Sequence, residues 1–543
     1  MTMARSAVAS SGRHYATLWE AIADRMPDRP ALAHGERRVS WGRFEQRSAR
    51  VAGVLAAAGL GHGDAVATYL YDCPEYFEIF FGALKIRAVP ANVNYRYTSD
   101  ELIALLDNVQ ATALFFDAAL RGRVAAIVDR IPGLLLVEVG GEGAPPIAGA
   151  HAYEEVVAAA DPAPRMPRYE ADVYLSYTGG TTGLPKGVLM GIGASMENSF
   201  WFRDLFFGRR VGLSPVDYAI RLVEDGVPAC AIPASPLMHS TGFVFASLPT
   251  LCAGGLVTTL RGRSFDAHEL LVTVEATGAQ VVAIVGDAFA IPIVRALDAG
   301  RAGGGGYDVG SLRVLCSAGV AWSAGIKQRL LEHVPQVTLL DACGATEGLS
   351  YGLSQVRRGD ALSTANFVAA SGLKVLSPQG TELGPGEVGR LAAPTTASGY
   401  HRDPQKTAAA FFVIDGVQYA APGDLGRIEA DGTVTLIGRG VTTINTGGEK
   451  VYPGEVEDAL RAYPGVEDCL VVGISDERFG QSVAALVVYD TTRPADPGEL
   501  AGALCKSLAG YKVPRRILLV DEIPRLPNGK VDYPTATAVL SDR

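Results

Sequence analysis

Cysteine is scarce in this chain, and its spacing suggests no pairing. The 543 residues include 7 cysteines, which are scattered and form no C-x-x-C pair. The 8 histidines show no H-E-x-x-H or similar spacing of metal ligands. An odd number of isolated cysteines argues against a disulfide framework and a zinc knuckle, and it is typical of a reducing compartment. We therefore expect a cytoplasmic protein.

Long apolar runs and a positive net charge are also missing. The most apolar uncharged window, residues 243–260, contains Pro249, Gly254 and Gly255, whereas a membrane-spanning helix needs about 20 apolar residues in succession. We interpret this window as a buried strand, a turn and a second strand. The N-terminal residues lack an apolar core, so we expect no signal peptide. With a net charge of −10, we expect neither a nucleic-acid partner nor integral membrane association.

The remaining composition is that of a folded protein with several cores. Apolar residues make up 48% of the chain and charged residues 20%, which is close to the usual globular mixture. Apolar spacing predicts a helix over residues 44–58 that ends at Gly59, a strand over 65–70 and a helix over 75–86. Continued alternation of this kind favours α/β layers with parallel sheets. Residues 138–170 are rich in glycine, alanine and proline, and we expect a surface loop there.

The clearest domain boundary lies near residues 438–446. Beyond it the pattern predicts a helix over 454–462, strands over 469–473 and 483–489, a helix over 498–507 and a strand over 516–520. These elements are enough for a small α+β domain of their own. We predict a large N-terminal domain over residues 1–438, a hinge over 439–446 and a small C-terminal domain over 447–543.

A loop rich in glycine and hydroxyl groups follows the strand-like run at residues 172–177. Its glycines allow backbone N–H groups to converge on an anion, its threonines add hydroxyl donors, and a lysine adds charge. The spacing is not that of a Walker A loop, and a solvated hairpin turn is the bland alternative. The candidate phosphate-binding residues are Thr178, Gly179, Gly180, Thr181, Thr182, Gly183 and Lys186.

This loop, Thr178-Gly-Gly-Thr-Thr-Gly-Leu-Pro-Lys-Gly187, resembles the signature motif of the adenylate-forming superfamily. Acyl-CoA synthetases, adenylation domains of peptide synthetases and luciferases belong to that superfamily. The resemblance runs from about residue 15 to about residue 534, and further motifs follow in the family's order. They lie at residues 236–242, 341–348, 399–402, 419–424 with 438–439, 447–457 and 527–530.

The resemblance implies a two-step reaction and its cofactors. A carboxylate attacks the α-phosphorus of ATP to give an acyl-adenylate and pyrophosphate, and a thiol, usually that of coenzyme A, then displaces AMP. ATP, Mg²⁺ and coenzyme A are the expected cofactors, and a small carboxylic acid is the expected partner. The implied fold is α/β, with a large N-terminal domain of fused αβα subdomains plus a β-barrel-like subdomain, and a small mobile α+β C-terminal domain. The sequence leaves a homodimer open.

The resemblance also assigns roles around the phosphates and the ribose. Thr346 would hydrogen-bond the α-phosphate, and Glu347 is similar to the family's metal-linked carboxylate, with a surface helix-capping acid as the alternative. Asp424 would accept hydrogen bonds from two ribose hydroxyls, and Arg439 would offer a planar fork of donors to the same sugar.

Adenine would lie against strand ends made of small residues. Residues that match these parts of the family pattern are Ser317, Ala318 and Gly319, together with Asp341, Ala342, Cys343 and Gly344. Many family members have an aromatic residue at the position of Cys343, where it stacks on adenine. We therefore expect weaker stacking here, and a larger share of the nucleotide affinity from the phosphates and the ribose.

The resemblance gives the small domain a part in both steps. Lys530 would reach the substrate carboxylate and the α-phosphate in the first step. A rotation at the hinge, with Thr442 as the expected pivot, would then bring Gly447, Gly448 and Lys450 to line a tunnel for pantetheine. Glycines suit a loop that a thin ligand must pass closely.

His239 lies where the family keeps a residue that borders the acyl and pantetheine entrances. Residues that we expect to line the acyl pocket are Phe243, Val285, Gly286, Asp287, Phe289, Ser317, Ala318 and Gly344. The aromatic residues at 200–207 either wall the tunnel or form an aromatic core helix, and the sequence leaves both open. No basic residue stands out among these candidates, so an apolar acid is favoured over an amino acid.

Residues 93–97, 438–440 and 447–452 look most like those of actinobacterial fatty-acid and steroid side-chain CoA ligases. The sequence therefore predicts an ATP-dependent acid–CoA ligase for a long-chain or polycyclic (steroid or terpenoid) acid. The alternatives are an enzyme that loads a carrier protein, a catalytically silent homologue and a luciferase-type oxygenase. A silent homologue is disfavoured because the charged residues of the motifs are intact, namely Lys186, Glu347, Asp424, Arg439 and Lys530.

We predict that Lys530→Ala slows adenylation by roughly 10²-fold or more, the scale of losing one donor that stabilises developing charge. Transfer of the acyl group from a preformed adenylate to CoA should be largely spared. ATP–pyrophosphate exchange measures the first step and thioester formation the second. An exchange rate near that of the wild type would refute the role of Lys530.

Overall fold

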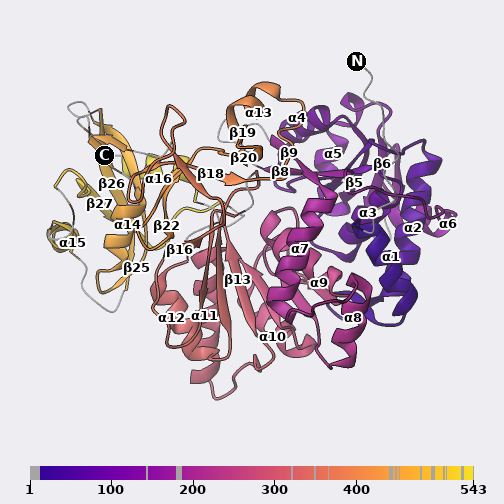
Figure 1. Cartoon of the computed structure of the whole chain (residues 1–543), viewed down its shortest axis with the longest axis horizontal. Coiled ribbons are helices and arrows are strands. Elements are labelled where there is room, and N and C mark those ends of the chain that lie inside the picture. Colours follow the sequence, from indigo (N-terminus) through magenta and orange to yellow (C-terminus); the bar gives the residue numbers. More distant parts are fainter. Residues whose placement is uncertain are drawn as a thin grey trace.

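A computed structural model gives the arrangement of the chain (Figure 1). It describes residues 13–141, 145–178, 186–319, 322–347, 350–364, 366–439, 444–446, 449–451, 453–476, 480–490, 496–505, 508, 510–526 and 531–541. Only the backbone is described for residues 438, 439, 445, 449, 450 and 480. The described residues form three β-sheets.

The first sheet has seven strands in the order β7-β6-β5-β3-β4-β8-β9. Its neighbours are parallel except β8 and β9, which form an antiparallel hairpin. The strands are β3 (Ala65–Tyr69), β4 (Val89–Asn92), β5 (Ala111–Asp117), β6 (Leu135–Val139), β7 (Ala150–Ala152), β8 (Val173–Thr178) and β9 (Lys186–Gly191).

Helices and aromatic packing cover this sheet. Rings of Trp19, Phe44 and Phe81 contact one another at centroid distances of 5.1 to 6.0 Å, which is the range of favourable edge and tilted contacts. The predicted elements at residues 44–58, 65–70 and 75–86 are confirmed. The helices are α1 (Tyr15–Arg25), α2 (Trp41–Ala57), α3 (Pro74–Lys85), α4 (Ser99–Val109), α5 (Arg121–Ala125) and α6 (Tyr153–Ala159).

The surface loop expected over residues 138–170 is only partly correct. Strand β7 and helix α6 lie within it, and Tyr153 and Val157 of α6 are buried. Tyr153 donates a hydrogen bond of 2.6 Å to Glu78 of α3. These two buried residues give a short alanine-rich segment enough tertiary packing to become a helix, which local composition does not reveal.

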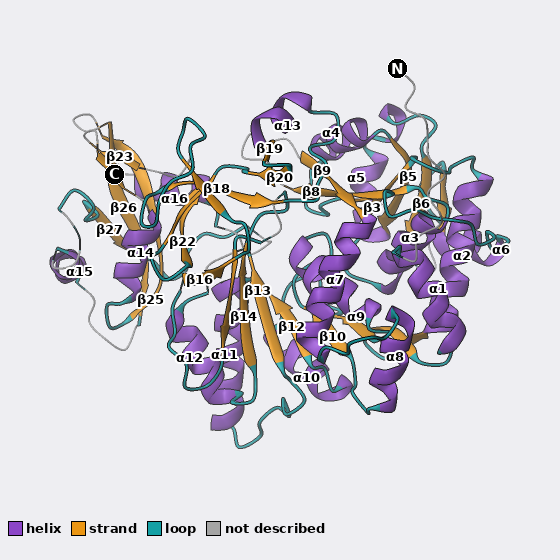
Figure 2. Cartoon of the chain, viewed as in Figure 1, coloured by secondary structure: helices purple, strands orange, loops and turns teal. Residues whose placement is uncertain are grey.

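One side of the second sheet is made of parallel strands (Figure 2). Strand β2 (Arg37–Ser40) pairs antiparallel with β1 at one edge. The parallel strands are, in spatial order, β1 (Pro30–His34), β11 (Leu256–Thr259), β10 (Cys230–Pro233), β12 (Val281–Ile284), β13 (Val314–Ala318) and β14 (Thr338–Cys343). The helices of this region are α7 (Ile192–Phe207), α8 (Pro215–Glu224), α10 (Ala267–Thr277), α11 (Gly286–Ala302) and α12 (Ala324–His333).

Antiparallel strands continue the same sheet beyond β14, where a β-barrel-like subdomain is expected. A single antiparallel bridge between Val188 and Tyr400 connects this region to β9 of the first sheet. Short helix α13 (Pro404–Ala410) follows the bridge. The strands are β15 (Gly352–Val356), β16 (Asn366–Ala369), β17 (Lys374–Leu376), β18 (Gly389–Pro394), β19 (Phe411–Ile414), β20 (Val417–Ala420), β21 (Asp424–Ile428) and β22 (Thr433–Arg439).

The strand–turn–strand expected over residues 243–260 is wrong in its first half. A π-helix, η3 (Thr241–Ser247), runs into α9 (Leu248–Cys252), and only β11 is a strand. Pro249 lies in the first turn of α9, just after the π-helix. A short uncharged apolar run fits a buried helix as well as a strand. No described helix is both long and apolar enough to cross a membrane.

The third sheet lies in the small C-terminal region (yellow in Figure 1). All five elements predicted there are confirmed, and the α/β class with a large and a small domain is confirmed. Residues 440–443 lie outside the described residues, so the hinge at 439–446 and the exact domain limits stay predictions. The elements are β23 (Ile444–Thr446), β24 (Glu449–Val451), α14 (Pro453–Arg461), β25 (Val466–Asp476), β26 (Gly480–Tyr489), α15 (Pro497–Leu504), β27 (Arg516–Leu519) and α16 (Tyr533–Ser541).

Candidate active site

The β8–β9 hairpin forms the base of the predicted phosphate loop. Thr178 ends β8 and lies opposite Lys186, which begins β9. The Nζ atom of Lys186 lies 5.3 Å from the ring centroid of Tyr400, within the range of a cation–π contact. The hairpin therefore places Thr178 and Lys186 at its loop end. Predicted loop residues outside the described residues are Gly179, Gly180, Thr181, Thr182 and Gly183.

Tyr400 connects the lysine to the predicted metal-linked acid. Its hydroxyl donates a hydrogen bond of 2.7 Å to Oε1 of Glu347, which is buried. The neighbouring backbone is held to β9 because His401 N–H donates to Gly187 C=O at 2.7 Å. Thr346 precedes Glu347 in a turn and is half-buried. The structure thus brings a cation, a phenol and a carboxylate together from distant parts of the chain.

The two residues predicted to bind ribose are cross-strand partners. Asp424 at the start of β21 pairs in register with Arg439 at the end of β22, and residues directly opposite each other have Cβ atoms about 4.5–5.5 Å apart. Oδ2 of Asp424 accepts a hydrogen bond of 2.8 Å from the Tyr351 hydroxyl. Burial raises the pKa of Tyr351 well above its ordinary value, so the phenol stays protonated and remains a donor. The sequence analysis did not identify Tyr351.

The residues predicted to bind adenine lie at the ends of adjacent parallel strands. Ser317 pairs with Asp341, and Ala318 pairs with Ala342. Gly319 follows with φ +90 and nothing near its missing Cβ, and Gly344 is exposed after β14. The Ser317 hydroxyl accepts a hydrogen bond of 2.8 Å from Gly286 N–H. Carboxyl ends of parallel strands are the usual place for ligands in open α/β sheets.

Neither the Asp341 carboxylate nor the Cys343 thiol is free to act on a ligand as an ordinary charged group. Lys327 of α12 donates to Asp341 Oδ2 at 2.7 Å, and both side chains are at most 5% exposed. Burial raises the pKa of Asp341 to about 6, although Lys327 opposes this shift. Burial also raises the pKa of the Cys343 thiol. Any contact of Asp341 with adenine therefore falls to its backbone, and the Cys343 thiol is not a reactive nucleophile.

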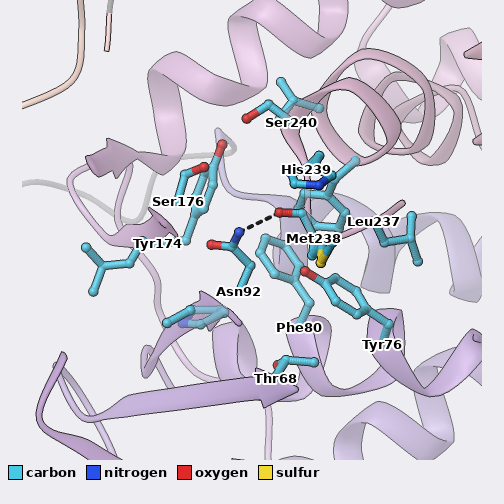
Figure 3. A pocket seen from close by; sticks show the side chains of 15 residues that line it. Thr68, Tyr76, Phe80, Asn92, Tyr174, Ser176, Leu237, Met238, His239 and Ser240 are labelled. Carbon is cyan, nitrogen blue, oxygen red and sulfur yellow. Dashed lines mark hydrogen bonds between the residues drawn. The ribbon is translucent and has the colours of Figure 1, made fainter. Parts of the chain in front are cut away.

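His239 lines a pocket between the first and second sheets (Figure 3). The pocket encloses about 390 Å³, counting the part open to solvent. Rings of Tyr76 and Phe80 from α3 contact Phe243 at centroid distances of 5.7 and 4.8 Å. Of the expected acyl-pocket residues only Phe243 lines this pocket. The remaining lining is Thr68, Pro90, Ala91, Asn92, Tyr174, Leu175, Ser176, Leu237, Met238, Ser240 and Val244.

The aromatic residues of α7 mostly form core. Phe202, Phe206 and Phe207 are buried in one hydrophobic cluster with residues of α8 and of the second sheet. Trp201 is 53% exposed. The structure therefore favours the core alternative for this helix over a tunnel wall.

Several predicted residues cannot be placed relative to the site. Lys530, Gly447 and Gly448 lie outside the described residues, and only backbone is described for Arg439 and Lys450. In the described part of the chain, no three His, Cys, Asp or Glu side chains are grouped so that they could hold a metal ion.

We predict that Lys327→Met destabilises the protein more at about pH 8 than at about pH 5, because the lost ammonium group lets burial raise the pKa of Asp341 further above about 6. A carboxyl whose folded-state pKa is raised loses stability as the pH climbs above its unfolded value. Breaking a buried pair costs about 3–5 kcal/mol, and we expect that loss at the higher pH. Urea unfolding at both pH values measures it.

The matched control for this experiment is Arg329→Met on the same helix. Arg329 pairs with Asp298 at the surface, where both side chains are more than 40% exposed. An exposed pair contributes about 0–1 kcal/mol, so its loss should change little at either pH. A Lys327→Met penalty that is the same at both pH values would contradict the buried pair.

Proteins of known name match this chain along almost its whole length. The 3-oxocholest-4-en-26-oate–CoA ligase of Rhodococcus rhodochrous is 35% identical over 539 residues, which cover 95% of this chain and 94% of the relative. The medium/long-chain-fatty-acid–CoA/3-oxocholest-4-en-26-oate–CoA ligase of Mycolicibacterium smegmatis is 35% identical over 541 residues, with 97% and 96% covered.

A solved structure and two family models agree with these matches. The ATP-bound crystal structure of MatB from Rhodopseudomonas palustris has a TM-score of 0.79 and 26% identity, and 97% of this chain and 99% of that chain are covered. The model of the AMP-binding enzymes matches residues 19–401, and that of the AMP-binding enzyme C-terminal domain matches residues 455–530. The resemblance inferred from the motifs is thereby confirmed, and the chain belongs to the AMP-binding enzyme family.

Proposed function

We propose that this protein is an ATP-dependent acid–CoA ligase. It activates an apolar carboxylic acid as an acyl-adenylate and transfers the acyl group to the thiol of coenzyme A. The observation that carries the proposal is the convergence of Lys186 and Glu347, from two separate motifs, on Tyr400 of a third, in a chain of the AMP-binding enzyme family. Each of these charged side chains contacts a specific side chain, whereas a charged residue at the surface needs only water around it.

In the first step, a substrate carboxylate oxygen forms a bond to the α-phosphorus of ATP. The bond from that phosphorus to the bridging oxygen breaks, and pyrophosphate leaves with its electron pair. The approaching anion meets the charge of the triphosphate, which only local cations and donors can offset. Thr178 and Lys186 stand at the base of the loop that would hold the phosphates. Thr346 is proposed to donate to the α-phosphate, and Lys530 is proposed to approach from the small domain.

Glu347 is the residue that would hold Mg²⁺. This ion commonly binds one or two protein carboxylates and takes its other ligands from phosphates and water. One buried carboxylate without a described acidic cluster fits that mode. Bound there, Mg²⁺ would neutralise phosphate charge. Tyr400 keeps its hydrogen bond to Oε1, which fixes the orientation of the carboxylate.

In the second step, the sulfur of coenzyme A attacks the acyl carbon and AMP leaves, while the thiol proton passes to solvent or to a nearby base. We propose that His239 borders the path of the thiol, because it lines the pocket between the first and second sheets. Gly447, Gly448 and Lys450 are proposed to line the pantetheine arm after the hinge at 439–446 turns. A homodimer and a cytoplasmic location stay predictions.

The preferred acid is proposed to be a fatty acid or a steroid side-chain acid. Two relatives with 35% identity are named for such acids. The pocket at His239 is lined mainly by apolar and aromatic side chains, and the described residues that line it include no lysine or arginine. A second carboxylate or an amino-acid zwitterion would lack a charged partner among these residues.

We predict that the purified protein forms CoA thioesters from fatty or steroid acids with release of AMP and pyrophosphate. A panel of fatty, aryl, steroid and diterpenoid acids, assayed with free CoA and with a holo-carrier protein, separates the alternatives. Thioester formation only on the carrier would favour the carrier-loading alternative. No ATP–pyrophosphate exchange with any acid would favour the silent homologue.

We predict that Tyr351→Phe raises the KM for ATP by about tenfold, since a hydrogen bond to a charged group is worth about 1.5–3 kcal/mol and only part of it acts on the ligand. The cause is that Asp424 loses the 2.8 Å hydrogen bond that orients it toward the ribose. The matched control is Tyr153→Phe, which removes a 2.6 Å hydrogen bond to Glu78 in the first sheet's helical layer. That control should lower stability and leave the KM for ATP unchanged. Equal KM values in all three proteins would contradict the role of Tyr351.

A further inference from the structure

The side-chain amide of Asn92 makes three short hydrogen bonds at the end of β4. Its Oδ1 accepts from Tyr177 N–H at 2.6 Å. Its Nδ2 donates to Tyr177 C=O at 3.0 Å and to Met238 C=O at 2.6 Å. Figure 3 shows Asn92 beside Met238 and His239, with the contact to Met238 dashed. An amide is the neutral side chain that can accept on one atom and donate twice on the other.

The partners of Asn92 belong to the two loops that the reaction needs. Tyr177 directly precedes Thr178 at the base of the phosphate loop, and Met238 directly precedes His239 on the substrate side. The first loop leaves the first sheet, and the second follows β10 of the second sheet. Asn92 is therefore a direct link between two sheets whose loops bind different substrates.

The hydrogen bonds from Asn92 to Tyr177 take the place of backbone pairing that ends where β4 ends. Strands β4 and β8 pair at Ala91 and Leu175, and β4 ends at Asn92. Tyr177 is two residues further along β8, where its N–H and C=O on that side have no strand beside them. The Asn92 amide serves both groups. A buried backbone group without a partner is costly, which explains why an amide stands here.

The substrate-side loop is fixed at a second point as well. Asp72 Oδ1 accepts a hydrogen bond of 2.9 Å from Leu237 N–H. Side chains from the first sheet thus hold two successive residues of this loop, Leu237 by Asp72 and Met238 by Asn92. Of the two, only Asn92 also holds the phosphate-loop strand.

We propose that Asn92 is a positioning residue for adenylation: it sets the distance between the phosphate loop and the substrate-side loop at His239. This inference rests on the proposed function. The reacting carboxylate and the α-phosphorus come from ligands held by different loops, and they must approach to about 3–3.5 Å in line. A displacement of one loop by about 1 Å is enough to cost roughly 10²-fold in rate. Each loop on its own would still bind its ligand.

The test compares Asn92→Ala and Asn92→Asp with Asn108→Ala. Asn92→Asp keeps the shape and the acceptor for Tyr177 N–H, but it sets a carboxylate oxygen against two carbonyl oxygens. The control removes the 2.6 Å hydrogen bond that Asn108 Oδ1 accepts from the Tyr177 hydroxyl. It therefore perturbs the same residue of β8 without touching Met238.

Four quantities are measured for each variant: the single-turnover rate of acyl-adenylate formation per titrated active site, the affinity for ATP alone, the affinity for the acid alone, and the thermal midpoint. For both Asn92 variants we expect a rate lower by roughly 10²-fold, with each separate affinity within about threefold of the wild type. The Asn108 variant should keep its rate within about threefold, whatever its thermal midpoint.

Other outcomes overturn the inference. Equal single-turnover rates in the Asn92 and Asn108 variants would make Asn92 a purely structural residue, and so would failure of both Asn92 variants to fold. A loss of affinity for ATP alone that accounts for the whole rate effect would make it part of the nucleotide site. If the wild type forms no adenylate with any acid, the proposed function itself fails, and this is seen before any variant is made.

Discussion

The backbone pairing of β9 with residues 398–401 is the constraint on which the candidate site depends. Ser398 N–H donates to Leu189 C=O at 3.1 Å, and Leu189 N–H donates to Gly399 C=O at 3.0 Å. Backbone pairs of this kind fix register to a single residue. They therefore place Tyr400 above Lys186 and beside Glu347. This pairing therefore relates the strand that begins at Lys186 to the Thr346–Glu347 turn through Tyr400.

A second layer of buried polar contacts holds the residues proposed to touch the substrates. Asp424 is oriented by Tyr351, β14 is tied to α12 by the Asp341–Lys327 pair, and the substrate-side loop is held by Asn92. Buried polar groups are tolerated where each one has its partner, and such networks are rigid for the same reason. Burying these polar groups costs free energy. In return, the side chains and loops that they hold in the large domain need not reorganise during the reaction.

The sequence predicts the chemistry of this protein better than it predicts the contacts that support the candidate site. Local patterns correctly predicted the elements at residues 44–58, 65–70 and 75–86, because each has one clear periodicity. The prediction for the window at 243–260 failed because the window contains no charged residue, and its few hydroxyl residues do not distinguish a helical from a strand period. Motif spacing identified Asp424 and Glu347, but Tyr351 and Asn92 have no signal of their own, since their roles exist only when distant strands meet. Asp341 was assigned to the nucleotide although its carboxylate is paired with Lys327, a partner on a helix that no local pattern connects to it.

The candidate site is divided between two sheets, and this division separates the requirements of nucleotide binding from those of acid binding. The residues proposed to bind the nucleotide are backbone groups, hydroxyls and fixed charges at strand ends, which tolerate little change because phosphate geometry is constant. The pocket at His239, which we propose for the acid, is formed by the packing of Tyr76, Phe80 and Phe243, where volume can change at the cost of a few apolar contacts. A fold of this kind can therefore accept new acids by altering α3 and η3 while the first step keeps its geometry. The contacts of Asn92 that join the two sheets must then be kept, because they relate the position of a variable pocket to that of the invariant phosphates.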